Sequence, residues 1–184
     1  PDGKMLATAT NQAVILWTLE GTELQTLPHP DDVQDIAFDP TGQIIATASF
    51  DSTVKLWTSD GVELQTFYHE NEVKAVSFSP DGQWLETSSV DKTARIWNVN
   101  QKRGFDTFQL QHGPFRHIML SPDGKTLATA TNRAVKLWNL QGQELNTLPH
   151  RDWVYNVAFS SNGENIATIG VDRVVTIWNR NGKI

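Results

Sequence analysis

The stretch PTGQIIATASFDSTVKLW, residues 40–57, decides the fold because the chain repeats it from end to end. Its counterparts are PDGKMLATATNQAVILW at 1–17, PDGQWLETSSVDKTARIW at 80–97, PDGKTLATATNRAVKLW at 122–138 and SNGENIATIGVDRVVTIW at 161–178. Each copy ends in a tryptophan, at positions 17, 57, 97, 138 and 178, so successive tryptophans are 40, 40, 41 and 40 residues apart. A fixed period of about 40 residues is typical of arrays in which each copy is one supersecondary unit. The sequence therefore predicts one domain over residues 1–184, with approximate repeats 1–38, 39–78, 79–120, 121–159 and 160–184.

Each repeat contains the pattern of four short strands. Around Trp57, the first strand includes Ile36-Ala37-Phe38 and runs into a turn that holds a glycine. The second strand reads IATA at 45–48, the third reads TVKLW at 53–57, and the fourth runs from Glu63 to Phe67. β-Branched and aromatic residues that alternate between turn residues are typical of strands. We therefore expect an all-β protein.

The turn between the second and third strands has two lengths. It is one residue shorter in repeats one and four, where it carries Asn11 and Asn132. Asparagine is well suited to the positive φ of a two-residue primed turn. We therefore expect positive φ angles at these two asparagines.

Composition narrows the classes of partner. Of the 184 residues 39% are hydrophobic and 20% are charged, and the formal net charge is −6. Such a chain has no excess of basic residues, so we expect neither nucleic acid nor a membrane surface as its partner. It has no cysteine, no signal peptide and no membrane span, a pattern compatible with the cytosol. We expect a cytoplasmic protein whose partner is a protein or peptide.

The repeated residues resemble the marks of the WD-repeat family over essentially the whole chain. These marks are a histidine between the fourth and first strands, a threonine in the second strand, an aspartate in the next turn and a tryptophan in the third strand. The first three are found at His29, His69, His112 and His150; at Thr8, Thr47, Thr87, Thr129 and Thr168; and at Asp51, Asp91 and Asp172. The Trp-Asp pair that names the family is Trp-Thr or Trp-Asn in every copy. The resemblance implies a β-propeller of four-stranded antiparallel blades, and such similar copies also resemble WD-repeat arrays of bacterial, especially cyanobacterial, signalling proteins.

The four marks are expected to form one hydrogen-bonded chain inside each blade. An indole only donates, a carboxylate only accepts, and a threonine hydroxyl and a neutral imidazole each do both, so the order Trp, Thr, His, Asp satisfies every member. We expect the full chain as Trp57, Thr47, His29, Asp51 in blade two; Trp97, Thr87, His69, Asp91 in blade three; and Trp178, Thr168, His150, Asp172 in blade five. Blade four keeps only Trp138, Thr129 and His112. The sequence predicts that this network is structural.

A catalytic interpretation of the same residues is much weaker. Thr, His and Asp also make up a catalytic triad, but this set recurs once per blade and its threonine lies within an ordinary strand. The repeated histidines are about 40 residues apart, a spacing of blades rather than of metal ligands. The extra histidine, His117, is most simply a strand or surface residue. We therefore expect no enzyme activity, no metal and no cofactor.

The ring of blades is expected to be partial or open. Repeat one supplies the last three strands of a blade and the final repeat supplies the first three, which gives about four and a half blades. These ends duplicate the same two strands, so they do not complete one blade between them. We favour a fragment of a longer array, with self-association through the open edges as the alternative.

The resemblance implies a non-catalytic scaffold or sensor that binds a protein or peptide on the face carrying the loops before the first strand and after the second. The candidate contact residues on this face are Lys74, Arg116, Arg151, Trp153 and Tyr155. The counterparts of Trp153 are Asp32, Glu72 and Pro114, so the fold does not require an aromatic ring there. Large aromatics beside arginines have the composition of an interface hot spot, while local packing of the rings is the alternative. A structural array that acts through self-assembly is the second hypothesis for function, and a propeller enzyme is a remote third.

Overall fold

In the part of the chain that the structure describes, eighteen β-strands form five antiparallel sheets that follow one another in chain order. The computed structural model describes residues 3–100, 106–110 and 115–183, and none of these residues is helical. Each sheet is a simple meander, with three strands in the first and last sheets and four in the others. The expected all-β architecture of a partial propeller is confirmed, and we call the sheets blades one to five.

The blades have the following strands. Blade one holds β1 (Met5–Ala9), β2 (Ala13–Thr18) and β3 (Glu23–Pro28). Blade two holds β4 (Val33–Phe38), β5 (Ile44–Ser49), β6 (Thr53–Thr58) and β7 (Glu63–Tyr68), and blade three holds β8 (Val73–Phe78), β9 (Trp84–Ser89), β10 (Ala94–Asn98) and β11 (Asp106–Leu110). Blade four holds β12 (His117–Leu120), β13 (Thr126–Ala130), β14 (Ala134–Asn139) and β15 (Glu144–Pro149). Blade five holds β16 (Val154–Phe159), β17 (Asn165–Gly170) and β18 (Val175–Asn179).

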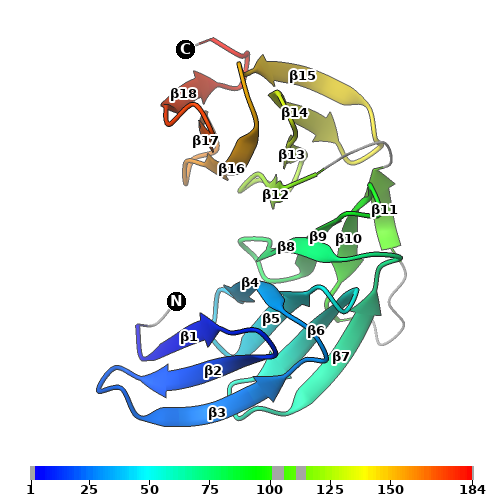
Figure 1. Cartoon of the computed structure of the whole chain (residues 1–184). Helices are drawn as coiled ribbons and strands as arrows, with labels where there is room; N and C mark the ends of the chain where they lie inside the picture. The colour runs from blue at the N-terminus through cyan, green and yellow to red at the C-terminus, as the bar shows by residue number, and fades with distance from the viewer. Residues whose placement is uncertain (1–2, 101–105, 111–114, 184) are drawn as a thin grey trace.

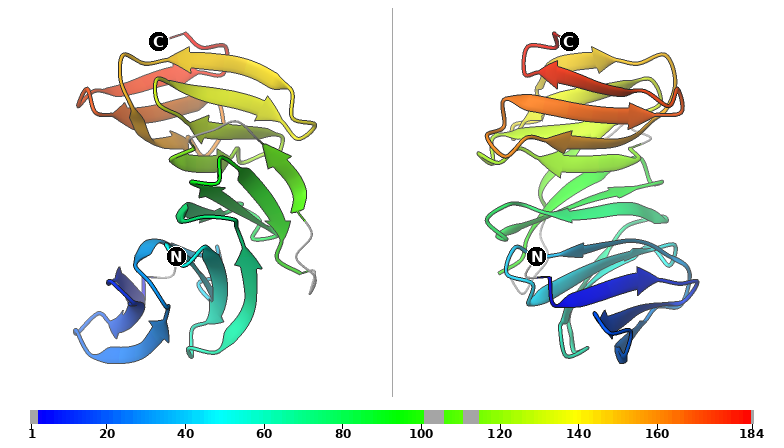
Figure 2. Two further views of the ribbon diagram at one scale, coloured as in Figure 1. Left: turned by 45° about the vertical axis from the view of Figure 1, so that its right-hand side comes forward. Right: turned by 90° about the vertical axis from the view of Figure 1, so that its left-hand side faces the viewer.

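The five blades are arranged in an open arc, with one edge of each sheet toward the inside of the arc (Figure 1). Strands β4, β8, β12 and β16 lie innermost, and β3, β7, β11 and β15 lie on the outer rim. Seen from the side, the sheets stack one upon the next (Figure 2). Each four-stranded blade takes its innermost strand from the sequence repeat before the one that supplies its other strands. The blades are therefore linked by the chain itself.

Neighbouring blades are held together by apolar faces. Between blades two and three, the buried side chains are Ala46, Ala48, Val54, Leu56 and Phe67 on one side and Val73, Val76, Leu85 and Trp97 on the other. Burying one tryptophan removes about 150–250 Å² from water, a gross gain of at most roughly 4–6 kcal/mol. A single blade has two such faces and cannot cover both, so each blade depends on its neighbours.

Within the described residues, no further blade packs on the outward face of blade five. Its Ile169, Val175 and Ile177 are 42%, 60% and 52% exposed. The corresponding Ala48, Val54 and Leu56 of blade two are buried against blade three. The outward face of blade five is therefore a sheet face of the kind that the interior blades bury.

The expectation of positive φ at Asn11 and Asn132 is wrong. Positive φ outside glycine occurs instead in the longer turns, at Ser52 (70°), Lys92 (68°) and Arg173 (60°). In the short turn of blade one, the backbone N–H and the hydroxyl of Thr10 both donate to the carbonyl of Ala13 over 2.8 Å. This pair of bonds, repeated at residue 131 in blade four, closes the short turn without a left-handed residue.

The contact between blades three and four contains a buried carboxyl group. Glu86 on β9 is fully buried, and its Oε2 accepts hydrogen bonds from Ser77 Oγ (2.6 Å) and from the backbone N–H of Leu120 (3.0 Å) in blade four. Its Oε1 has no partner in the part of the chain that the structure describes. Burial raises the pKa of Glu86 to about 7, so the carboxyl group keeps its proton over most of the range below neutrality.

At the other contacts between blades, different residue types occupy the positions of Glu86 and Leu120. The position of Glu86 is an alanine in every other blade, at residues 7, 46, 128 and 167. The position of Leu120 is a phenylalanine in blades two, three and five, at residues 38, 78 and 159, and each of these rings packs in the same cluster as the facing alanine. Thus a small residue faces a large one at three contacts, and a glutamate faces a leucine at the fourth.

We predict that Glu86→Gln changes how stability depends on pH. The unfolded chain releases the Glu86 proton near pH 4.5, whereas the folded chain keeps it up to about pH 7. The native chain should therefore lose unfolding free energy relative to the Gln variant as the pH rises from 4.5 to 7, by on the order of 3 kcal/mol, and lose no more above that.

Urea titrations at a series of pH values measure this difference. Glu164→Gln, which removes an exposed carboxyl group, is the control and should change the unfolding free energy by less than about 0.5 kcal/mol. Parallel pH profiles for the native chain and Glu86→Gln would contradict the burial of an ionisable Glu86.

Candidate functional site

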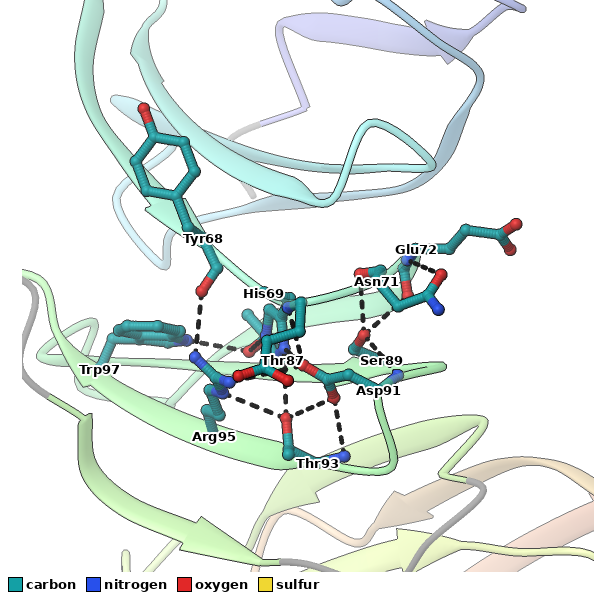
Figure 3. A network of polar contacts seen from close by, with 11 residues as sticks. Tyr68, His69, Asn71, Glu72, Thr87, Ser89, Asp91, Thr93, Arg95 and Trp97 are labelled. Atoms are coloured by element: carbon teal, nitrogen blue, oxygen red, sulfur yellow. Dashed lines mark hydrogen bonds and ion pairs between the residues drawn. The ribbon is translucent and has the colours of Figure 1, made fainter.

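The four marked residue types meet inside blade three (Figure 3). Trp97 Nε1 on β10 donates to Thr87 Oγ1 on β9 over 2.9 Å. His69, from the loop before β8, places Nε2 2.8 Å from the same hydroxyl and Nδ1 2.9 Å from Asp91 Oδ2. Because the indole only donates and the carboxylate only accepts, the hydroxyl donates to Nε2 and the imidazole carries its proton on Nδ1. The result is a one-way chain of donors from the tryptophan to the aspartate.

Burial and hydrogen bonding fix the charges in this chain. Burial lowers the pKa of His69 to about 4, although Asp91 acts in the opposite direction. Burial of Asp91 disfavours its charge, but hydrogen bonds from Thr93, His69 and the backbone of Glu70 outweigh it and lower its pKa to about 2. At neutral pH the network therefore contains a neutral imidazole and an ionised carboxylate.

Blade two repeats this geometry. Trp57 Nε1 donates to Thr47 Oγ1 over 2.9 Å, and that hydroxyl lies 2.6 Å from His29 Nε2. His29 Nδ1 is 2.9 Å from Asp51 Oδ2. Burial lowers the pKa of this histidine as well. The side chains of the Thr, His and Asp are enclosed, so the network has no group open to a ligand.

The remaining blades hold shorter versions. The indole of Trp17 donates to Thr8 (2.8 Å) in blade one, and that of Trp138 donates to Thr129 (2.9 Å) in blade four. His112, expected to join the blade-four pair, lies outside the described residues. In these two blades the described network is a single hydrogen bond.

Blade five differs from the four-membered chain that we expected. Trp178 does donate to Thr168 over 2.8 Å, but His150 Nε2 is buried without a hydrogen-bond partner among the described residues. Asp172 is exposed, and among the described residues its one hydrogen-bond donor is the backbone N–H of Val174 (3.1 Å). The structure therefore does not bring His150 into hydrogen-bond contact with either Thr168 or Asp172.

A threonine two residues after the aspartate explains this difference. The hydroxyls of Thr53 and Thr93 donate to Oδ1 of Asp51 and Asp91 over 2.5 and 2.6 Å, which turns Oδ2 toward the histidine. Blade five has Val174 at this position. Without this hydroxyl to orient it, Asp172 is exposed.

A serine two residues before the aspartate also belongs to the network. Ser89 Oγ donates to the backbone carbonyls of Asn71 and Glu72 (2.9 and 2.8 Å) and accepts from the N–H of Asp91 (3.0 Å). Ser49 has the same place in blade two, whereas blade five has Gly170. Sequence reasoning missed the serine and threonine, although both recur in repeats two and three and both are replaced in repeat five.

A second cluster lies on the loop face of blades four and five. The guanidinium carbon of Arg116 is 4.1 Å from the centroid of the Trp153 ring and 5.7 Å from that of Tyr155. Tyr155 is the extra residue of a β-bulge in β16, because the pairing with β17 shifts between Val154 and Asn156. A bulge turns a side chain away from its regular direction. Trp153 and Tyr155 remain 38% and 51% exposed.

Gly170 allows the Trp153 loop to approach β17. A Cβ atom on this glycine would lie 2.4 Å from the carbonyl oxygen of Trp153, closer than any side chain tolerates. The same carbonyl accepts a hydrogen bond from Val171 N over 2.8 Å. The loss of the serine in blade five is thus coupled to the position of Trp153.

The other expected contact residues lie apart from this cluster. Lys74 Nζ is 2.7 Å from Glu72 and 3.7 Å from the ring centroid of Phe50, so it belongs to blades two and three. Arg151 is exposed and has no side-chain hydrogen bond or ion pair within the described segments. His117 is a strand residue, as one of the two expected alternatives had it: it begins β12 and is half-buried, and burial lowers its pKa to about 4. Of the five candidate residues, three meet in one cluster.

Comparison with known proteins identifies the family. The family described as "WD domain, G-beta repeat" matches residues 21–58, 61–98, 106–139 and 142–179. The chain therefore belongs to the WD-repeat family, whose members are generally non-catalytic and bind proteins or peptides.

Two relatives share shorter segments with this chain. The coronin-like protein of Saccharomyces cerevisiae is 35% identical over 66 residues, which is 34% of this chain and 10% of that protein. The human WD repeat and SOCS box-containing protein 1 is 29% identical over 69 residues, 35% of this chain and 16% of that protein. The matches thus span between a tenth and a sixth of these relatives' own length.

Residues 3–100, 106–110 and 115–183 lack two further kinds of feature. These residues contain no group of three or more His, Cys, Asp or Glu side chains arranged to hold a metal ion. They also form no helix of the length and hydrophobicity needed to cross a membrane.

We predict that Asp91→Ala destabilises the protein by about 1–3 kcal/mol, because it leaves the buried groups of His69 and Thr93 without their acceptor. Asp172→Ala is the matched control, since this aspartate has the same place in blade five but contacts neither a histidine nor a hydroxyl. It should cost less than about 0.5 kcal/mol. Denaturant titrations compare the two, and equal losses would remove the special role of the complete network.

Proposed function

We propose that this chain is a non-catalytic scaffold that binds a protein or peptide through the loop face of blades four and five. The observation that carries the proposal is the stack of Arg116 on Trp153 and Tyr155. Both rings are substantially exposed, although a tryptophan is usually buried to a large degree. Exposed aromatics with an arginine are the composition of interface hot spots.

The chemistry of the stack suits recognition. A guanidinium that lies over an aromatic ring keeps the hydrogen-bond donors in its plane available to a partner. The two rings offer apolar area with few freely rotating bonds, so little side-chain entropy is lost when a partner covers them. The cluster is therefore ordered before a partner arrives.

The buried networks support a scaffold rather than an enzyme. The hydroxyl of Thr87 accepts a hydrogen bond from Trp97 and donates one to His69. Its proton is therefore already engaged, and the oxygen is not accessible to a substrate. The same holds for Thr47 in blade two. A nucleophile needs access to the reacting atom, and these hydroxyls are fully buried.

A second candidate function is assembly through the outward face of blade five. Ile169, Val175 and Ile177 expose on this face the positions that other blades bury. Light scattering of the purified chain separates the two functions: a mass that grows with concentration favours assembly, and a constant monomer mass favours the scaffold.

We predict that Trp153→Ala weakens capture of a partner at least tenfold, because a central aromatic commonly contributes about 2 kcal/mol or more to binding. The immobilised chain would be exposed to a lysate of its source cells, and retained proteins would be quantified. Leu145→Ala, which removes an exposed side chain on β15, should leave capture unchanged.

Melting temperatures of the same variants complete the test. Trp153→Ala should melt within a few degrees of the native chain, since its ring is partly exposed. A large drop would make Trp153 a packing residue, and unchanged capture would place the binding site elsewhere.

A further inference from the structure

The loop face of blades four and five carries four arginines that have no carboxylate partner among the described residues. They are Arg116, Arg133, Arg151 and Arg173, and all four are exposed. None makes an ion pair or side-chain hydrogen bond within the residues that the structure describes. By contrast, Arg95 pairs with Asp91 and Arg180 pairs with Asp123. These four arginines thus lie on one face, which we call the arginine face.

Backbone contacts tie these arginines to one surface. The carbonyl of Arg133 accepts a hydrogen bond from His150 N (2.8 Å), which places it beside the loop that contains Arg151. The carbonyl of Trp153, at the end of that loop, accepts from Val171 N (2.8 Å), and the turn then continues to Arg173. Arg116 joins from blade four through its stack on Trp153. The loops that carry Arg133, Arg151 and Arg173 therefore adjoin the loop of Trp153, and Arg116 contacts its ring.

The acidic residues nearest in sequence, Asp152 and Asp172, offset only two of the four positive charges on these loops. Asp152 Oδ1 accepts from the backbone of Trp153 over 2.8 Å. Asp172 Oδ1 accepts from the backbone of Val174 over 3.1 Å. Both carboxylates are thus used in their own turns, and neither is in an ion pair with an arginine in the described segments.

The same loops of blades two and three have the opposite charge. They carry Asp31, Asp32, Glu70 and Glu72. Lys74, which also lies there, pairs with Glu72 over 2.7 Å. A positive patch on a chain of net charge −6 draws an anionic ligand to one end of the loop face and away from the other.

We propose that the arginine face binds an acidic peptide segment whose carboxylates pair with the four arginines while one of its apolar side chains rests on Trp153 and Tyr155. The proposal rests on the function proposed above and specifies the partner's chemistry. A guanidinium binds a carboxylate through two parallel hydrogen bonds, which fixes orientation as well as charge. The exposed aromatic rings beside Arg116 favour a segment of mixed character over a simple run of acids.

The probe is a fluorescein-labelled decapeptide of glutamates with a central leucine, and binding is followed by fluorescence anisotropy. We expect its Kd to rise at least tenfold between about 50 mM and about 500 mM salt, because exposed charges are screened. The double variant Arg116→Gln/Arg151→Gln should weaken binding at least tenfold. Lys125→Gln/Lys183→Gln, which removes the same charge from residues outside the arginine face, should bind as the native chain does.

Three results would overturn the inference: no binding of the glutamate peptide, equal loss of binding in both double variants, or binding only of a peptide with phosphoserine in place of glutamate. The last would assign the face to phosphate instead of carboxylate. Failure here is distinguishable from failure of the proposed function. If Trp153→Ala still abolishes partner capture while the glutamate peptide does not bind, the scaffold role stands and only the acidic chemistry is lost.

Discussion

The burial of one sheet face against the next is the interaction on which the rest of this structure depends. It takes the tryptophan of each third strand into the interior, as for Trp57 and Trp97. A buried indole N–H requires an acceptor, and a threonine of the neighbouring strand supplies it. That hydroxyl in turn needs an acceptor, which leads through a histidine to a carboxylate near the surface. The polar network is thus the consequence of placing a tryptophan at the contact between blades.

The arrangement of the blades and of their polar network could be predicted from the sequence because the same residue types recur from repeat to repeat. The period, the four strands and the arrangement of His69 between Thr87 and Asp91 all follow from residue types that return in register. The prediction for blade five was wrong because the presence of the right residue types does not establish their geometry. Asp172 is present, but no threonine hydroxyl orients its carboxylate. Glu86 was missed for another reason, since its burial depends on contact with the next blade, which residue types alone do not show. The sequence also did not show which neighbouring blade a side chain contacts. Lys74 and Arg116 have equivalent positions in their blades, yet Lys74 stacks on a ring of the preceding blade and Arg116 on a ring of the following blade.

Stability and recognition are assigned to different parts of the blade. The networks are enclosed and nearly the same in blades two and three, so they carry no information about a partner. The β-bulge at the start of the innermost strand takes no part in these networks. It holds different side chains in different blades, such as Lys74 and Tyr155. A site can therefore change there without disturbing the tryptophan and its acceptors.

The pairing of Glu86 with Leu120 means that these similar repeats are not interchangeable. Repeats so alike favour recombination within a gene, which adds, removes or reorders copies. A copy with alanine at the Glu86 position fits a following phenylalanine, as Ala46 and Phe78 do. A rearrangement that set Glu86 against a phenylalanine would crowd a buried carboxyl group, and one that set an alanine against Leu120 would leave a void. Because a mismatch at this one contact would destabilise the protein, the contact limits the order in which the blades can be arranged. It thereby preserves the position of the arginines relative to the acidic loops.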